Sequence, residues 1–478
     1  MSTTRKIARN TSILSISQII SYILIFFYTI YIARFLGADG FGILSFALAF
    51  SGIFSIFADL GLNILTVREV ARNKSLAKKY LGNVLLIKLI LAFLTFGLIV
   101  LFVNLLSYPQ EIILVVYFIS LSTIISSIFG IFYSIFQAYE KIGYQSLGQI
   151  LSSLIMFFGV LLGISLGFDV IEFSLLYFIS NIMILIYNII IYFQKFSFPR
   201  MEYDKEFWKI TVKESLPFGI TGISGMIYTN IDSVMLSLIQ GNEVVGWYNA
   251  AYRLILVLLF IPTIINTVIF PKMSQYYNSS RTSLKLMNEK YFKFMLMIGF
   301  PMAIVVTLLA NKLILLIFGQ EYTQSIIALQ ILIWTTLFTF AGASFVQLIQ
   351  ATNNQFVITK ISGICVIVNI ALNLILIPKF SYIGASIATL ITEIILVGYI
   401  IWVNYNIGFG IRLDLIVKDI SKILFSCLIM GSFIWYFKSL NIFILGVLAI
   451  LLYIGVLYFI RGFDNIDMRI FREIIGRE

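Results

Sequence analysis

The sequence predicts an all-α, polytopic membrane protein of about fourteen transmembrane helices, arranged as two parallel six-helix lobes plus two extra C-terminal helices. The 478 residues are 60% hydrophobic and only 12% charged, with a mean hydropathy of +1.01. Soluble proteins carry about 25% charged residues, so this composition does not suit a water-facing surface. Apolar stretches of membrane-spanning length recur along the whole chain, and the loops between them alternate between rich and poor in Lys and Arg.

The apolar stretches are continuous and about 20 to 25 residues long, which is the length of a membrane-spanning helix. Strands of a membrane barrel would instead alternate apolar and polar residues over about ten positions. Residues 11–33 are too long for the apolar core of a signal peptide and are predicted to be a retained first helix. The predicted spans are 11–33, 40–62, 82–106, 111–137, 146–167, 170–194, 214–239, 244–269, 290–316, 324–350, 356–378, 381–405, 415–437 and 441–460.

Lysine and arginine gather on one side of these predicted helices. The opposite side carries only Arg34, Lys312, Lys379 and Lys438, and two further cations, Lys88 and Arg253, lie inside apolar stretches. Because cationic loops are retained in the cytoplasm, we expect a multi-pass protein of the cell (cytoplasmic or inner) membrane with both termini cytoplasmic. The net charge of +11 follows from this bias, with a contribution from anionic membrane lipids, and nucleic acid is not an expected partner.

No residues suited to catalysis or cofactor binding stand out. The chain has no histidine, and its only cysteines, Cys365 and Cys427, lie within apolar stretches. These features exclude haem ligation, most zinc sites and a disulfide framework. No phosphate-binding loop of the G-x-x-x-x-G-K-[ST] type is present. We therefore expect no enzyme activity, no cofactor and no metal site.

A weak internal repeat divides the chain. Residues 37–51 align with 241–255, which matches Gly37 with Gly241, Gly42 with Gly246 and Ala47 with Ala251. Six predicted helices lie between the two copies of the repeat, so both six-helix units enter the membrane from the same side and the lobes are parallel. The predicted domains are an N-terminal lobe at 1–194, a cytoplasmic inter-lobe loop at 195–213, a C-terminal lobe at 214–405, and helices 13 and 14 with a cytoplasmic tail at 406–478.

Five ionisable residues are predicted inside the membrane: Asp59, Lys88, Asp232, Arg253 and Glu393. Each costs about 2.5 to 3.5 kcal/mol at a helix centre, so each requires a partner or water. Asp232 and Arg253 lie on consecutive helices, roughly 13 to 18 Å from the outer turn between them, and are predicted to pair near mid-membrane. One interpretation is an ion pair that only pins helix seven to helix eight; the other is a charge placed for a ligand.

Polar residues around this pair predict a substrate-binding face. Asn249 and Arg253 are four residues apart and share one side of helix eight. Interhelical hydrogen bonding is the alternative role for the Asn residues. Pro262 is expected to kink helix eight and help open a cavity. The candidate substrate-binding residues are Arg253, Asp232, Asn249, Tyr252, Asn230, Lys88 and Asn266, and the candidate coupling or gating residues are Asp59, Glu393 and Pro262.

Short motifs in both halves resemble the polysaccharide-biosynthesis flippases of the multidrug/oligosaccharidyl-lipid/polysaccharide exporter superfamily. The similarity spans most of the first twelve helices. In the first half it rests on Ala33-Arg34-Phe35-Leu36-Gly37, Phe41-Gly42, Asp59-Leu60-Gly61-Leu62 and Arg68-Glu69. In the second half it rests on Asp232, Gly246-Trp247-Tyr248, Ala250-Ala251, Phe270-Pro271, Phe318-Gly319, Glu321-Tyr322, Ile377-Pro378-Lys379 and Gly384-Ala385-Ser386.

The resemblance implies alternating access that moves a polyprenyl-pyrophosphate-linked oligosaccharide across the cytoplasmic membrane for surface polysaccharide or glycan assembly. It also implies a cationic central cavity for the pyrophosphate, with Arg253 at the expected helix-eight position. The implied partners are the lipid-linked oligosaccharide, membrane lipids, and glycosyltransferases or a polymerase of the same pathway. Few other cations lie in the first lobe's membrane region, which departs from that pattern. The alternative is a cation-coupled drug antiporter of the same superfamily, which would favour intramembrane carboxylates without a central cation.

Overall fold

The computed structural model describes residues 3–196, 203–352, 354–410 and 413–464 of the chain, and helices are the only regular elements in these ranges. An all-α fold was predicted, and it is confirmed. Pro199 and Arg200, which belong to the predicted inter-lobe loop, lie outside the described residues. The chain forms two compact units, Met1–Asn249 and Ala250–Glu478, which are described separately. This division is based on contacts between residues, whereas the predicted lobes were based on the internal repeat. The domain boundaries predicted from the sequence therefore stay a prediction.

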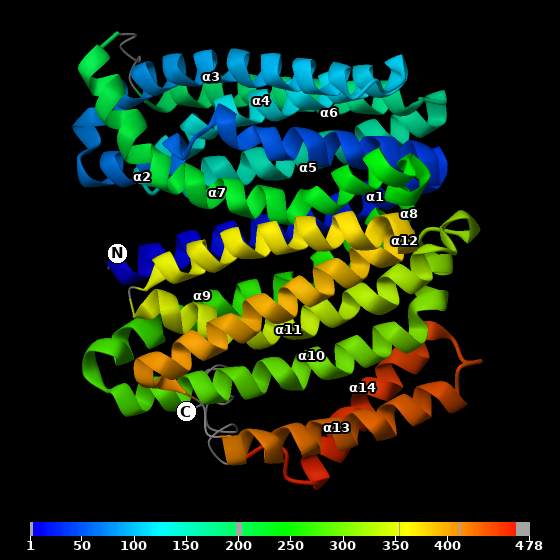
Figure 1. Ribbon diagram of the computed structural model, residues 1–478. Coiled ribbons are helices and arrows are strands. Elements are labelled where there is room, and N and C mark those ends of the chain that lie inside the picture. The colour runs from blue at the N-terminus through cyan, green and yellow to red at the C-terminus, as the bar shows by residue number, and fades with distance from the viewer. Residues whose placement is uncertain (1–2, 197–202, 353, 411–412, 465–478) are drawn as a thin grey trace. The chain divides into compact units, whose positions relative to one another are not determined.

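The first unit is a bundle of long helices (Figure 1). Gly37 (φ 71°) bends α1, so that this one element contains the predicted span 11–33 and most of the predicted span 40–62. Asp169 and Glu172 form a capping box at the start of α6, which satisfies two backbone N–H groups there. The helices are α1 (Thr3–Ser55), α2 (Leu62–Arg72), α3 (Ala77–Leu105), α4 (Gln110–Ala138), α5 (Ile142–Leu166), α6 (Val170–Lys195), α7 (Lys205–Gln240) and the first part of α8 (Asn242–Leu258).

The second unit begins within α8. Its largest helix pairings join α11 to α10 and to α12, and α13 and α14 pack beside α10 (Figure 1). Ser381 (φ 54°) interrupts α12, which therefore contains the predicted spans 356–378 and 381–405. The helices are α9 (Phe260–Ser279), α10 (Arg281–Ile317), α11 (Ser325–Ala351), α12 (Gln355–Asn404), α13 (Leu413–Tyr436) and α14 (Ile442–Phe459).

The structure confirms a polytopic membrane protein. Ten helical segments of the described residues are long and apolar enough to cross a membrane. Two of these segments are the bent helices α1 and α12, each of which holds two predicted spans. The less apolar helices α7 and α13 match the remaining predicted spans at 214–239 and 415–437. Several helices extend beyond the predicted apolar cores into the cationic loops, because polar residues continue a helix once it has left the hydrocarbon.

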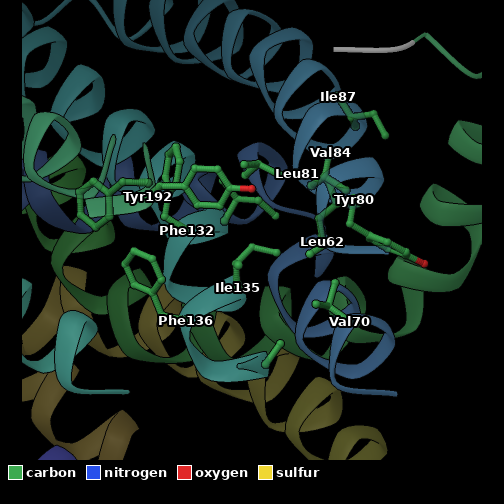
Figure 2. Close-up of a cluster of buried hydrophobic side chains, with 14 of the residues drawn as sticks. Leu62, Val70, Tyr80, Leu81, Val84, Ile87, Phe132, Ile135, Phe136 and Tyr192 are labelled. Carbon is green, nitrogen blue, oxygen red and sulfur yellow. The ribbon is translucent and has the colours of Figure 1, made fainter. Parts of the chain in front are cut away.

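Aromatic and aliphatic side chains form a buried cluster at one end of the first unit. Figure 2 shows Leu62 and Val70 of α2 beside Leu81 and Val84 of α3, with Phe132 of α4 and Tyr192 of α6 further along the same cluster. Phe207 and Trp208, at the start of α7, pack against its edge. This cluster holds α2, α3, α4 and the N-terminal end of α7 together and so fixes the position of the break between α1 and α2.

The two glycines matched by the repeat lie against one another within the first unit. A Cβ atom on Gly42 would lie 1.8 Å from the carbonyl oxygen of Asn242, and one on Gly246 would lie 1.9 Å from that of Ala38. The repeat aligns Ala38 with Asn242 as well as Gly42 with Gly246, so each helix makes the same contact with the other. Only glycine permits this backbone approach. The repeat has therefore produced a local two-fold crossing of α1 and α8.

Replacing Gly42 by Ala is expected to destabilise the protein by about 1 to 3 kcal/mol or more, because the new methyl group collides with backbone rather than with a flexible side chain. The thermal midpoint of the purified protein in detergent measures this loss. The matched control is Gly97→Ala on α3, where nothing lies within 4 Å of the added atom. The control is expected to keep or slightly raise the midpoint; equal effects of the two substitutions would contradict a tight crossing.

Candidate functional site

A buried ion pair joins the break between α1 and α2 to α3. The chain leaves α1 through a short 3-10 turn and turns at Leu60 and Gly61, both with positive φ. This places Asp59 Oδ1 2.6 Å from Lys88 Nζ of α3. Lys88 also donates to the carbonyl oxygen of Ser127 on α4 at 2.6 Å, with the Ser127 hydroxyl 3.4 Å away. These contacts satisfy the three donors of the ammonium group.

Asp59 and Lys88 were considered separately in the sequence, and the structure brings them together. The Lys88 side chain is fully buried, so it does not extend to the membrane surface. Asp59 also accepts the backbone N–H of Asn63 at 3.3 Å, close to the start of α2. Every donor of Lys88 is engaged within the first unit, which favours a structural role over direct substrate binding. Its predicted substrate-binding role stays a prediction.

Close to this pair, α7 packs against the α1–α2 break. A Cβ atom on Gly61 would lie 2.6 Å from the carbonyl oxygen of Ser215, and one on Gly219 would lie 3.0 Å from the carbonyl group of Leu60. Arg68 of α2 bonds Glu214 of α7 at 2.5 Å. We call this contact region, made by Leu60, Gly61 and Arg68 with Glu214, Ser215 and Gly219, the α2–α7 contact.

A second ion pair lies one helix away, between the start of α3 and the start of α7. Lys79 Nζ lies 2.7 Å from Asp204 Oδ2, and the hydrogen bond from Lys79 lowers the pKa of the Asp204 carboxyl group. These extramembrane pairs are exposed and therefore individually weak. The sequence singled out Arg68 only within a family motif, and neither ion pair was predicted.

Further along α7, polar residues join α7 to the first turns of α8. Asp232 is buried, with 5% of its surface exposed, and accepts a 2.7 Å hydrogen bond from the hydroxyl of Tyr248. One residue later in each helix, Asn249 donates to the Ser233 hydroxyl at 2.9 Å. Both bonds join residues sixteen positions apart, as expected of a tight helical hairpin. Tyr248 is thus one partner of Asp232 that the predicted site omitted.

Asn230, two residues before Asp232, faces α1 and not α8. Its amide lies over Gly52, where an added Cβ would be 3.4 Å from Nδ2. The same amide donates to the carbonyl oxygen of Met226 at 2.9 Å. Gly42, Gly52 and Gly61 therefore all lie at close contacts between the first two spans and α7 or α8.

Arg253 lies on α8 in the second unit, and its side chain is half-buried. Its Nε atom is buried and has no hydrogen-bond partner among the described residues. A buried donor left without an acceptor costs about 1 to 3 kcal/mol, and such atoms in native structures usually bond to a water, ion or ligand. Asp232 and Arg253 fall in different compact units, and their pairing stays a prediction.

The other predicted residues of helix eight that belong to the second unit are Tyr252, Pro262 and Asn266. The helix is interrupted at Leu259, between α8 and α9, three residues before Pro262. Proline cannot donate to the preceding turn, and its ring crowds the carbonyl group four residues back, so an interruption here is expected. Asn266 of α9 accepts a 2.6 Å hydrogen bond from the hydroxyl of Tyr291 on α10. Tyr252 is half-buried on α8.

Glu393 lies on the second arm of α12 and is buried, with 7% of its surface exposed. Its Oε1 accepts a 2.6 Å hydrogen bond from Thr339 of α11, a partner that the sequence did not indicate. One residue earlier, the carbonyl oxygen of Thr392 lies 4.0 Å from the thiol of Cys365 on the first arm of α12. Glu393 is therefore part of the α11–α12 packing, and its predicted gating role stays a prediction.

Comparisons with known proteins agree with this arrangement of helices. A family model described as "Polysaccharide biosynthesis protein" matches residues 7–277, and a model described as "MatE" matches residues 217–375. The chain is 28% identical over 229 residues to the "Uncharacterized membrane protein MJ1068" of Methanocaldococcus jannaschii, which covers 46% of this chain. It is 24% identical over 242 residues to the "Probable low-salt glycan biosynthesis flippase Agl15" of Haloferax volcanii, which covers 50% of this chain.

The chain spans about half the length of these curated relatives, 45% of the first and 50% of the second. The fold extends further than the sequence similarity. The solved structure described as "Lipid II flippase MurJ, inward closed conformation" matches with a TM-score of 0.78 at 19% identity, over 94% of this chain and 98% of that one. Because the first family model covers more than half of the residues, the chain belongs to the polysaccharide biosynthesis protein family.

Proposed function

We propose that the chain is a flippase that moves a polyprenyl-pyrophosphate-linked oligosaccharide across the membrane by alternating access. The observation that carries the proposal is the buried, unpartnered Nε of Arg253 on a helix of the transport fold. A pyrophosphate group cannot cross hydrocarbon without compensating charge and hydrogen bonds. The planar guanidinium group offers phosphate oxygens several donors in a fixed geometry. Arg253 therefore anchors the head group while the polyprenyl tail remains in the bilayer.

The glycine crossing and the α2–α7 contact lie near opposite ends of α7, and we assign a different role in transport to each. The Gly42–Gly246 crossing is a backbone contact that tolerates rotation but not separation, which suits a pivot. At the other end, exposed charges join α2 to α7 through Arg68 and Glu214. Exposed ion pairs are worth little, so breaking them costs little free energy. We assign the α2–α7 contact as the gate that opens to admit the sugar head group.

The cationic loops lie at the gated end, which orients the transporter. Retention of such loops in the cytoplasm gives a cell-membrane protein with cytoplasmic termini and a gate facing the cytoplasm. Glycosyltransferases that build the lipid-linked sugar would then deliver it on the gated side, and a polymerase or transferase would use it on the other. The chain itself contributes transport and not bond-making chemistry.

A cation-coupled drug antiporter is the second candidate, favoured by the MatE match over residues 217–375. Such a protein uses intramembrane carboxylates to bind cations. In this chain Asp59 is paired with Lys88, Asp232 accepts from Tyr248, and Glu393 accepts from Thr339. A fixed cation at Arg253 would also repel cationic drugs. We therefore favour the flippase.

Reconstituted vesicles distinguish these functions. The protein is expected to move a fluorescent polyprenyl-pyrophosphate sugar to the opposite leaflet and not to extrude cationic dyes. Arg253→Ala is expected to slow translocation roughly tenfold or more, since a phosphate loses a charge-assisted hydrogen bond. Arg253→Lys keeps the charge without the planar donors and is expected to be intermediate.

Lys438→Ala, which removes an exposed cation between α13 and α14, serves as the control and is expected to transport normally. Normal translocation by Arg253→Ala would overturn the anchor role. Dye extrusion without lipid translocation would replace the flippase with the antiporter.

Cross-linking tests the gate. In a background with Cys365 and Cys427 replaced by Ala, Arg68→Cys and Glu214→Cys are joined by a short reversible thiol cross-linker. Because the α2–α7 contact must part in each cycle, the linked protein is expected to lose translocation and to regain it after reduction. Each single-cysteine variant treated in the same way is the control. Continued transport by fully linked protein would mean that this contact does not open.

We assign a structural role to the Asp59–Lys88 pair. The thermal midpoints of protein variants that lack one or both charges test this assignment. Lys88→Met leaves the Asp59 carboxylate without its cation and is expected to cost about 3 to 5 kcal/mol. Adding Asp59→Asn removes the remaining charge, and the double variant is expected to regain most of the thermal midpoint that Lys88→Met loses. If the double variant were as unstable as the single one, the loss would come from packing and not from an unpaired charge.

A further inference from the structure

A cavity of about 290 Å³ lies in the second unit, where α10 and α13 begin and the chain leaves α14. Neither Arg253 nor any other residue of α8 lines this cavity, and the proposed transport does not use it. Three carboxylates line it together with five cations: Lys290, Lys293, Lys418, Lys422 and Arg461. The lining therefore has a surplus of positive charge.

The carboxylates are committed to the α10 side of the cavity. Asp464 pairs with Lys290, and it also lies 3.7 Å from the largely buried Lys293. Asp419 of α13 lies 3.3 Å from the same Lys293. These pairs join α10, α13 and the segment after α14 into one wall. They leave three of the five cations in the lining without an ion pair in the described part of the chain.

The other three cations of the lining, Lys418, Lys422 and Arg461, form no ion pair within the described residues. Lys418 and Lys422 are four residues apart and so share a face of α13. Lys422 donates to the backbone carbonyl group of Arg461 at 2.7 Å, which orients its ammonium group without neutralising it. Lys418 and the Arg461 side chain are exposed. Three cationic groups thus line the cavity without an ion pair to any described residue, and the one carboxylate next to them on α13, Asp419, is paired with Lys293 of α10.

Apolar surface adjoins these cations. Ile416, Ile420 and Ile423 contribute to the cavity lining. On the outer side of α13, Val417, Leu424 and Leu428 are exposed by 65%, 39% and 67% and recur at i, i+7 and i+11, so they form one stripe along the helix. The stripe begins beside Lys418. A ligand that fits both features has an anionic head and an apolar tail.

We propose that this cavity binds the phosphate of an anionic phospholipid whose acyl chains lie along the exposed stripe of α13. Basic pockets at the ends of transmembrane helices recognise such head groups, and each nearby Lys or Arg contributes measurably to the attraction. A soluble anion would use the cations but not the apolar stripe. The bound lipid would join α13 and α14 to α10 and so stabilise the C-terminal helices against the rest of the second unit.

The test measures lipid binding to the purified full-length protein by native mass spectrometry. Phosphatidylglycerol is expected to bind in preference to phosphatidylcholine. Lys418→Gln with Arg461→Gln should weaken phosphatidylglycerol binding roughly tenfold, since two charges are lost at the head group. Neither side chain has a structural partner among the described residues, so the variant is expected to fold. Lys422→Gln provides an independent second variant.

Lys360→Gln with Lys438→Gln removes the same charge from exposed positions outside the cavity and is the matched control. Equal lipid binding by the cavity variant and the control would overturn the proposal. Displacement of phosphatidylglycerol by millimolar inorganic phosphate would instead identify a site for soluble anions. Displacement by a polyprenyl pyrophosphate at equal concentration would identify a substrate site, and either result would overturn the lipid assignment.

Discussion

A polar group inside the bilayer has no water to bond to, so the chain must supply its partner. That constraint explains most of the charged and polar contacts in this protein. Lys88 directs its donors to Asp59 and Ser127, Asp232 accepts from Tyr248, and Glu393 accepts from Thr339. Arg253 differs, because its buried Nε finds no acceptor in the described residues. Uncharged buried atoms such as Thr95 Oγ1 and Gln347 Oε1 also have no partner among the described residues, so it is the positive charge of Arg253 that supports our proposal of an anionic ligand there.

The same bilayer makes close backbone packing more important than apolar burial between helices, because lipid tails are as apolar as the side chains. Gly42 and Gly246 show the result, since each presents its backbone to a carbonyl group of the other helix. Gly61 and Gly219 also permit a close backbone approach, toward the opposite end of α7, and the ion pair between Arg68 and Glu214 lies beside them. The two ends therefore differ in chemistry. The end at Gly42 and Gly246 has a close backbone approach, and the end at Gly61 and Gly219 adds exposed ion pairs that solvent can replace.

Much of this fold was predictable, because hydropathy and cation placement respond to the bilayer directly. Most of each predicted span lies within a helix, although α7 and α10 each begin nine residues earlier than predicted, and the interruption at Leu259 follows from the geometry of Pro262. Partners across helices were not predictable. Asp59 and Lys88 were both expected near the same membrane face, yet only the turn at Leu60 and Gly61 brings them within 2.6 Å. Tyr248 and Thr339 gave no signal, since a hydroxyl group inside an apolar helix does not reveal which neighbour it contacts.

We propose that Arg253 receives a pyrophosphate, and equilibrium binding tests this role without depending on the transport cycle. The affinity of the purified protein for a short-chain polyprenyl pyrophosphate is compared with that of Arg253→Ala, with the neutral polyprenol as reference. The account predicts that the pyrophosphate binds more tightly than the alcohol and that Arg253→Ala removes most of this difference. If the substitution left the preference for pyrophosphate unchanged, the anion would bind elsewhere and the assignment of Arg253 would be wrong.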